Sequence, residues 1–142
     1  MDAHEGGCKE KARACRVLIT DDSLITRMFL KDMLESNGHT VVGEAKNAAE
    51  SLALYKETHP DITTMDMNMP ESSGLEAIRS IVDFDADARF IIVSAVDQKL
   101  VRDQYAHMGT CEYVSKPAEW GKLKDAIGRI MRNDTTRRKS DA

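Results

Sequence analysis

Apolar and polar residues alternate along the chain in blocks that predict strands and helices in turn. The run RVLIT at 16–20 is short and apolar, and a polar triplet ends it, as expected of a strand covered on both faces. A helix is predicted next, at 24–35, before an Asn37-Gly38 stop signal. On this helix apolar side chains recur at helical spacing and charged ones lie opposite: Ile25, Met28, Phe29 and Met33 against Arg27, Lys31 and Glu35.

The same pattern of strand and then helix recurs four more times. Further strands are predicted at 40–45, 61–65, 90–94 and 111–115. Helices are predicted at 47–58, from Ser73 onward, at 97–108 and at 119–131. Each parallel crossover needs a connection of helix length, and right-handed crossovers dominate. The alternation therefore predicts a doubly wound α/β domain, with a five-stranded parallel sheet and helices on both faces.

Length and composition limit the possible functions. The 142 residues fit one domain, predicted at 16–132, with a flexible N-terminal extension at 1–15 and a polar basic tail at 133–142. After Met131 too few residues remain for an output domain. The net charge of −4 gives no overall attraction to nucleic acid or to an anionic membrane, and the longest apolar stretch is far below the ~20 residues of a membrane span. A soluble, cytoplasmic protein is expected, and the three cysteines predict no disulfide framework.

Polar side chains with chemical potential follow the ends of four predicted strands. They are Asp21 and Asp22, then Asp66, Ser94 and Lys116. Singly, each has a structural explanation as a helix cap, a turn residue, a strand-end hydrogen bonder or a solvated charge. Ligands of doubly wound sheets, however, bind beyond the carboxyl ends of the strands. Three carboxylates at one edge repel, which raises the pKa of at least one unless a cation neutralises them, and Mg²⁺ (or Mn²⁺) suits such oxygen ligands.

An aspartate beside such a cation can act as a nucleophile toward phosphorus. The predicted product is then an aspartyl phosphate at one of the three aspartates, with Lys116 and the Ser94 hydroxyl in contact with the phosphoryl oxygens that the metal leaves free. The sequence contains no P-loop motif, so a nucleotide donor has no support. The phosphoryl group is expected from a small molecule or from another protein.

These residues occur in motifs that are recognisable together. The chain resembles the receiver domain of bacterial two-component response regulators, in the stand-alone, CheY-like form, over residues 16 to 132. The motifs are the acidic pair Asp21-Asp22, D-x-x-M-P-x-x-x-G from Asp66 to Gly74, Ser94-Ala95 and the stretch YVSKP at 113–117. The resemblance implies a flavodoxin-like fold with the strand order 2-1-3-4-5.

The resemblance also implies a role for each site residue. Asp66 would be phosphorylated, and Asp22, Asp66 and the backbone carbonyl of Asn68 would ligate Mg²⁺ directly, while Asp21 would act mainly through metal-bound water. Ser94 would be the switch hydroxyl, Tyr113 the switch aromatic and Lys116 the phosphate-binding lysine. Two departures from the family pattern, Thr63-Thr64 before the phosphoacceptor and Val96 after Ser94, bear on the lifetime of the phosphoryl group.

Partners follow from the same resemblance. A histidine kinase would supply the phosphoryl group to a monomeric, non-enzymatic signalling protein. The stretches RMFLKDML and TMDMNMP look like those of chemotaxis regulators, which implies a flagellar switch protein as target and a phosphatase as a further partner. The target would dock on a face formed by 97–108, 111–115 and 119–131.

Other functions stay open as alternatives. A stand-alone receiver could serve a phosphorelay other than chemotaxis. A haloacid-type phosphohydrolase also uses an aspartate nucleophile, but its motif needs a second carboxylate where this chain has Asn68. A flavodoxin-like FMN carrier would place a phosphate where Asp21 and Asp22 repel it. A receiver-like module that works without phosphorylation would have no use for the complete acidic site.

Overall fold

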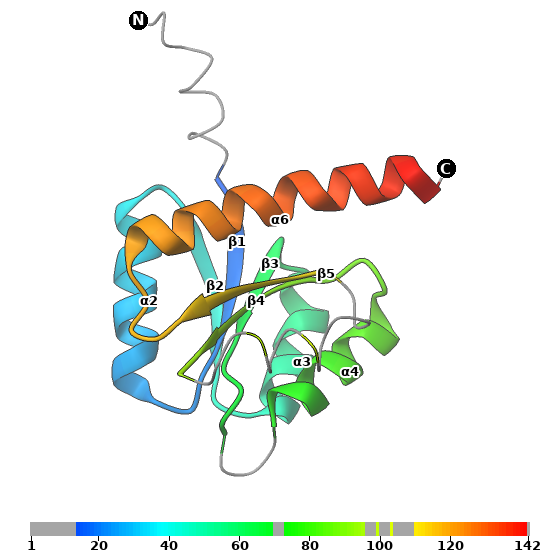
Figure 1. Ribbon diagram of the computed structural model, residues 1–142. Coiled ribbons are helices and arrows are strands. Elements are labelled where there is room, and N and C mark those ends of the chain that lie inside the picture. Colours follow the sequence, from blue (N-terminus) through cyan, green and yellow to red (C-terminus); the bar gives the residue numbers. More distant parts are fainter. Residues whose placement is uncertain (1–13, 70–72, 96–98, 100–102, 104–109, 142) are drawn as a thin grey trace, which may run out of the picture.

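The computed structural model describes residues 14–69, 73–95, 99, 103 and 110–141, and its centre is a parallel sheet (Figure 1). Five strands lie in the order β2-β1-β3-β4-β5. The strands are β1 (Arg16–Thr20), β2 (Thr40–Ala45), β3 (Ile62–Met65), β4 (Arg89–Ser94) and β5 (Thr110–Ser115). All four strand pairs are parallel. The predicted fold class and strand order are confirmed.

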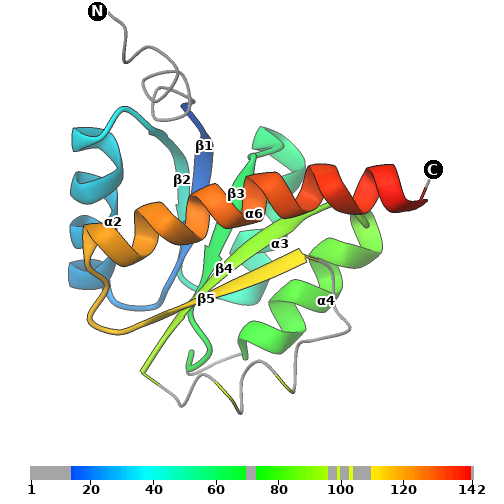
Figure 2. The same ribbon diagram turned by 45° about the horizontal axis from the view of Figure 1, so that its top comes forward.

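Helices cover both faces of this sheet. Helices α2 (Leu24–Ser36) and α6 (Trp120–Asp141) lie on one face, and α3 (Ala48–Thr58) and α4 (Gly74–Phe84) on the other (Figures 1 and 2). The predicted helix at 97–108 falls almost wholly outside the described residues, as do Val96 and residues 1–13. Among the helices that are described, none is long and apolar enough to cross a membrane.

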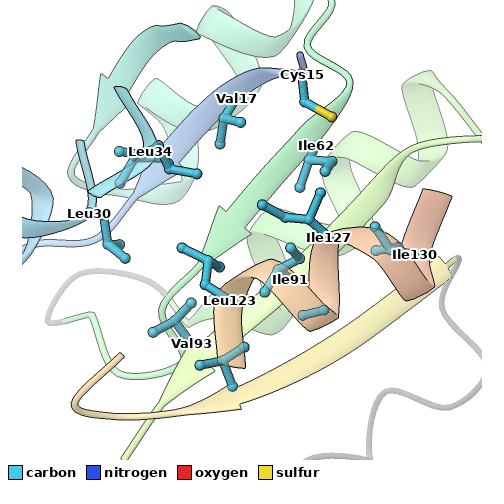
Figure 3. Packing of buried hydrophobic residues seen from close by; sticks show 13 residues of the cluster. Cys15, Val17, Leu30, Leu34, Ile62, Ile91, Val93, Leu123, Ile127 and Ile130 are labelled. Atoms are coloured by element: carbon cyan, nitrogen blue, oxygen red, sulfur yellow. The ribbon is translucent and has the colours of Figure 1, made fainter. Parts of the chain in front are cut away.

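The sheet separates two apolar clusters because successive side chains of a strand point to opposite faces. The first cluster packs Leu30 and Leu34 of α2 and Leu123 and Ile127 of α6 against inward-facing strand residues (Figure 3). Its strand residues include Val17, Ile19, Ile62, Ile91 and Val93. The second cluster packs α3 and α4 against Leu18, Met65, Phe90 and Ile92. The inner strands β1, β3 and β4 are therefore anchored at both faces, and the carboxyl ends of the strands are held at one edge.

Local sequence signals set the helix starts as expected. The side chain of Asn47 accepts a hydrogen bond from the backbone N–H of Glu50 at 2.8 Å. Ser73 and Glu76 form a full capping box, in which each side chain accepts from the backbone N–H of the other residue. Such caps satisfy backbone donors that the first helical turn leaves unpaired. Both predicted helix starts are confirmed.

The face that α2 turns to the core differs from the predicted one. Leu30 and Leu34 are buried, while Ile25, Met28 and Phe29 are 71%, 60% and 67% exposed. Helical spacing alone allows two neighbouring apolar stripes on this helix, and the path of the chain out of β1 decides which stripe meets the sheet. Of the predicted charged side only Arg27 is largely covered, while Lys31 and Glu35 are exposed. Of the predicted apolar stripe only Met33 packs against the first cluster.

Two ordered features lie at the ends of the predicted domain. Cys15, placed in the flexible extension, is buried in the first cluster, and its backbone N–H donates to Nδ1 of His39 at 3.1 Å. Helix α6 continues to Asp141, although the sequence predicts a helix end near residue 131 and then a tail. No Gly or Pro follows Gly128 to stop the helix. The last turns of α6 run past the strands in both views (Figures 1 and 2).

Candidate functional site

The predicted site residues gather at the carboxyl edge of the sheet. Asp21 follows β1, Asp66 follows β3, Ser94 ends β4 and Lys116 follows β5. Asp21, Asp66 and Ser94 are buried, with 1%, 4% and 4% of their surfaces exposed, whereas Asp22 is exposed. Backbone hydrogen bonds fix the edge, since the N–H of Asp66 donates to the carbonyl of Thr20 at 3.0 Å. The sheet thus delivers these side chains to one place.

Three carboxylates form the centre of this edge. Asp21, Asp22 and Asp66 each offer an oxygen, and these oxygens all lie within 4.8 Å of one another. Hard divalent cations such as Mg²⁺ prefer oxygen ligands of this kind. The donor set therefore fits Mg²⁺, with Asp22 open to solvent and to further ligands. The backbone N–H of Asn68, the residue whose carbonyl is the predicted ligand, donates to Oδ1 of Asp66 at 3.3 Å.

Lys116 supplies the positive charge at this edge. Its Nζ lies 3.1 Å from Oδ2 of Asp21 and 3.4 Å from Oδ1 of Asp66. Its backbone N–H donates to the carbonyl of Ser94 at 2.9 Å, which ties the end of β5 to the end of β4. Burial alone would lower the pKa of Lys116, but the hydrogen bond to Asp21 and the charges of both aspartates raise it above its usual value. Lys116 is therefore a fixed cation at neutral pH.

The pKa of Asp66 is raised first by burial and second by the crowding of carboxylates that the sequence predicts. Burial and the neighbouring charge of Asp21 raise the pKa of Asp66 to about 6, although Lys116 and the N–H of Asn68 act in the opposite direction. A cation that neutralises the cluster would lower this pKa. A metal ion held by the cluster would therefore favour the ionised form of Asp66.

Gly74 lets the chain pass close to the backbone of Asp66. A Cβ at residue 74 would lie 2.6 Å from the backbone oxygen of Asp66 and 2.5 Å from Cε of Met67. The N–H of Gly74 also donates to the carbonyl of Met67 at 3.3 Å. Only glycine fits such an approach without a shift of the backbone.

The two predicted switch residues lie on neighbouring strands. Ser94 is buried at the end of β4, in register with Ser115 of β5. Tyr113 is half-buried in β5, in register with Ile92, and packs against the second cluster. Their motion on phosphorylation stays a prediction.

Sequence reasoning missed one polar contact beside the site. Arg27 was predicted on the solvated side of its helix, but its NH1 donates to the carbonyl of Asp21 at 2.7 Å and its Nε to Glu44 at 3.1 Å. An Arg six residues after the first aspartate and a Glu near the end of β2 were the only signals in the sequence. Neither signal specifies the contact, because Glu44 is 17 residues from Arg27 and the hydrogen bond to Asp21 depends on how the helix is rotated.

Comparisons with known proteins agree with this geometry. The model of the response regulator receiver domain family matches residues 17–128. Chemotaxis protein CheY of Thermotoga maritima is 38% identical over 117 residues, which cover 82% of this chain and 98% of that protein. Chemotaxis protein CheY of Bacillus subtilis is 39% identical over 118 residues, covering 83% and 98% respectively.

Solved structures show the same fold at similar identity. The CheX-CheY-BeF3-Mg²⁺ complex from Borrelia burgdorferi matches with a TM-score of 0.76 and 30% identity, over 82% of this chain and 88% of that one. The response regulator domain of Thermotoga maritima CheB matches with a TM-score of 0.71 and 31% identity, over 87% of this chain and 98% of that one. With the family match spanning most of the chain, this protein belongs to the response regulator receiver domain family.

Proposed function

We propose that this chain is a response regulator receiver that accepts a phosphoryl group on Asp66 from a phosphohistidine of a histidine kinase. One observation carries the proposal. Asp66 is a buried carboxylate whose oxygen lies within 4.8 Å of two further carboxylates and 3.4 Å from the ammonium of Lys116. A nucleophile, a cation site and a fixed positive charge are then available at one point, as phosphoryl transfer requires.

Each site residue would have its own role in phosphoryl transfer. An oxygen of Asp66 attacks phosphorus, the P–N bond to the donor histidine breaks, and its electron pair stays on the imidazole, which takes up a proton. Asp22, Asp66 and the carbonyl of Asn68 would hold Mg²⁺, and Asp21 would contact it through water. When bound, Mg²⁺ would neutralise charge on the phosphoryl oxygens. Lys116 and Ser94 would contact the oxygens that remain.

The protein would signal by binding rather than by turning over a substrate. Its only chemistry would be phosphorylation of its own Asp66 and slow hydrolysis of the aspartyl phosphate. Contacts of Ser94 and Lys116 that exist only in the phosphorylated state would bias two conformations, and Tyr113 would then turn inward. The face formed by 97–108, β5 and the first turns of α6 would bind the target.

Control of flagellar rotation is the favoured pathway. The support is the names of the relatives, several of which are chemotaxis proteins CheY that match over nearly their whole length. The target would then be a flagellar switch protein, and a phosphatase would remove the phosphoryl group from the monomeric protein. A phosphorelay outside chemotaxis is the alternative, and a pull-down with phosphorylated protein distinguishes the two.

The phosphoacceptor assignment is tested by labelling. Purified protein is incubated with acetyl phosphate, with and without Mg²⁺, and the adduct is located by mass spectrometry. We expect an adduct on Asp66 that needs the cation and that hydroxylamine cleaves. Asp66→Asn and Asp66→Ala should give no specific adduct, and labelling of either variant at the wild-type rate would refute the assignment.

The output surface is tested at Tyr113. Tyr113→Ala and Tyr113→Trp should change the affinity for the target while Asp66 labelling stays within a few-fold of wild type. A target footprint by hydrogen exchange that lies wholly over α3 would refute this face.

A further inference from the structure

Arg27 joins three elements beside the acidic edge. From α2, its guanidinium donates through NH1 to the backbone carbonyl of Asp21 at 2.7 Å and through Nε to Oε1 of Glu44 in β2 at 3.1 Å. Only 14% of the Arg27 side chain is exposed, although α2 is a surface helix. Such charge-assisted hydrogen bonds are stronger than neutral ones. The contact therefore fixes the segment after β1 relative to α2 and β2.

The backbone of Asp21 is held from both sides. Its N–H donates to the carbonyl of Ala45 at 2.9 Å, and its carbonyl accepts from Arg27. Glu44, the residue that orients Arg27, directly precedes Ala45 in β2. The end of β2 thus contributes to both contacts.

The carbonyl of Asp21 belongs to the peptide group that leads into Asp22. A peptide group is planar and turns as one unit, so a hydrogen bond to its oxygen also fixes the direction in which Asp22 leaves the strand. Asp22 is exposed, yet its carboxylate lies within 4.8 Å of those of Asp21 and Asp66. The direction in which Asp22 leaves the strand therefore decides whether its side chain can reach the other two carboxylates.

We propose that Arg27, oriented by Glu44, is a positioning residue for the cation site, because it fixes the Asp21-Asp22 peptide group and so holds the Asp22 carboxylate toward Asp21 and Asp66. The inference rests on the proposed function, because it adds a residue that orients the ligands of the proposed cation site. Glu44 offsets the charge of Arg27 and also lies 3.9 Å from Nζ of Lys31. Because the charge of Arg27 is offset, its effect on the cation site comes from the hydrogen bond to the Asp21 carbonyl and not from its charge.

A second ion pair in the molecule offers a matched control. Nε of Arg129 in α6 lies 2.8 Å from Oε1 of Glu112 in β5, so it too joins a helix to a strand. This hydrogen bond goes to a side chain and not to the backbone of a site residue. Arg129→Gln removes an ion pair of the same composition without touching the Asp21-Asp22 peptide group.

The first measurement is cation affinity. Mg²⁺ binding to full-length Arg27→Gln, Arg27→Lys, Glu44→Gln and Arg129→Gln is measured by calorimetry at a temperature where circular dichroism shows each to be folded. We expect Arg27→Gln to raise the dissociation constant about tenfold, as loss of a group that orients a metal ligand commonly does. Arg27→Lys and Glu44→Gln should fall between this variant and wild type. Arg129→Gln should match wild type.

The second measurement separates positioning from loss of structure. In Arg27→Gln the Mg²⁺ concentration for half-maximal labelling of Asp66 by acetyl phosphate should rise by the same factor, while the rate at saturating Mg²⁺ stays close to that of wild type. The amide resonance of Asp22 should also shift in the metal-free variant. Unchanged Mg²⁺ affinity in a less stable Arg27→Gln would overturn the inference, as would a lower saturating rate at an unchanged Mg²⁺ midpoint.

Failure of this inference is distinguishable from failure of the proposed function. If wild type binds Mg²⁺ and is labelled on Asp66, and Arg27→Gln behaves identically, only the role of Arg27 is wrong. If wild type neither binds Mg²⁺ nor is labelled, the proposed function is wrong and the role of Arg27 falls with it.

Discussion

At the amino edge of the sheet, where the strands begin, charged side chains form hydrogen bonds with nearby backbone groups. The backbone N–H of Arg16 donates to the carboxylate of Asp61 at 2.8 Å, and NH1 of Arg89 donates to the carbonyl of Asp61 at 3.0 Å. The guanidinium of Arg16 also reaches the carbonyl of His59 at 2.8 Å. These hydrogen bonds connect the first residues of β1 and β4 to the segment that precedes β3.

At the carboxyl edge the charges do not balance. The carboxylates of Asp21, Asp22 and Asp66 lie together, and the ammonium of Lys116 contacts two of them. The consequence is visible in the pKa of Asp66, which burial and Asp21 raise to about 6. Edges of one sheet, built from the same strands, thus differ in whether their charges are satisfied internally. The unbalanced edge is where the proposed cation and phosphoryl group would bind.

The largest difference between the two edges is expected when a glycine at each is replaced by alanine and the labelling of Asp66 is compared. At the carboxyl edge, Gly74→Ala would place a Cβ 2.6 Å from the backbone oxygen of Asp66, so the backbone must shift. We expect a loss of roughly 1–3 kcal/mol in the free energy of unfolding, typical of overpacking, together with much slower labelling of Asp66. Urea denaturation and mass spectrometry measure the two effects.

The control for this change lies at Gly38, before β2. A Cβ at Gly38 meets nothing within 4 Å, but its φ of +92° strains any residue that has a Cβ. Gly38→Ala should therefore lower stability by about 1–2 kcal/mol without slowing labelling of the folded protein. Equal labelling rates in Gly74→Ala and wild type would contradict the role given to the close approach at Asp66.

The charge difference between the edges predicts that removing a basic side chain changes Mg²⁺ affinity at the carboxyl edge and stability at the amino edge. Lys116 competes with a metal ion for Asp21 and Asp66, so Lys116→Met should bind Mg²⁺ about tenfold more tightly, or about 1.4 kcal/mol, the order expected of one partly exposed charge. Arg16→Met at the amino edge should leave Mg²⁺ affinity unchanged and lower stability instead. Calorimetry on both variants is the test, and weaker Mg²⁺ binding by Lys116→Met would contradict the proposed competition.

Most of the fold could be predicted because its signals are local. The apolar runs of β1 and β4 and the Ser73 capping box need only neighbouring residues to be recognised. The orientation of α2 could not be predicted, since Leu30 and Leu34 compete with a second apolar stripe and only the sheet decides between them. The end of α6 was missed because composition at 133–142 resembles a tail, although no residue there stops a helix.

The site was predictable to the extent that topology determines it. Parallel strands bring their carboxyl ends to one edge, so Asp21, Asp66 and Lys116 could be grouped from the order of the elements alone. Arg27 could not be added to that group, because it contacts the backbone of Asp21 through a bond that depends on the rotation of α2. Glu44, its partner, is 17 residues away in sequence and has no motif of its own.

Smaller effects are expected at the amino edge, where polar groups serve structure alone. The hydroxyl of Tyr55 donates to Oδ2 of Asp85 at 2.8 Å, joining α3 to the end of α4. Burial, with the adjacent Asp85, raises the pKa of Tyr55 above its usual value, so the hydroxyl stays protonated. Tyr55→Phe should lower the free energy of unfolding by about 1 kcal/mol and leave both Mg²⁺ affinity and labelling unchanged. A change in Mg²⁺ affinity would show that the two edges are coupled.

The smallest expected effect is a pH dependence at His39, also at the amino edge. Nδ1 of this buried ring accepts the backbone N–H of Cys15, so the ring is neutral, and burial lowers its pKa below the usual value. Below about pH 6.5 the unfolded chain takes up a proton that the folded protein refuses. The contribution of His39 to stability is therefore present above pH 6.5 and is lost as the pH falls through the lowered pKa of the folded state.

His39→Asn isolates this contribution, because the Asn side chain can still accept from Cys15 but does not titrate. Urea unfolding at pH 7.5 and 5.5 can be followed by the fluorescence of Trp120, the only tryptophan, whose ring centroid lies 5.9 Å from that of His39. Wild type should lose more stability than His39→Asn on acidification, since acidic groups such as Asp66 titrate equally in both. His59→Asn is the control, because the side chain of His59 is exposed. Its backbone is in the left-handed region at φ 46°, which Asn tolerates. Equal losses in wild type and His39→Asn would show that the ring of His39 is protonated inside the folded protein without cost, and that the amino edge is not closed to protons in the way its hydrogen bonds suggest.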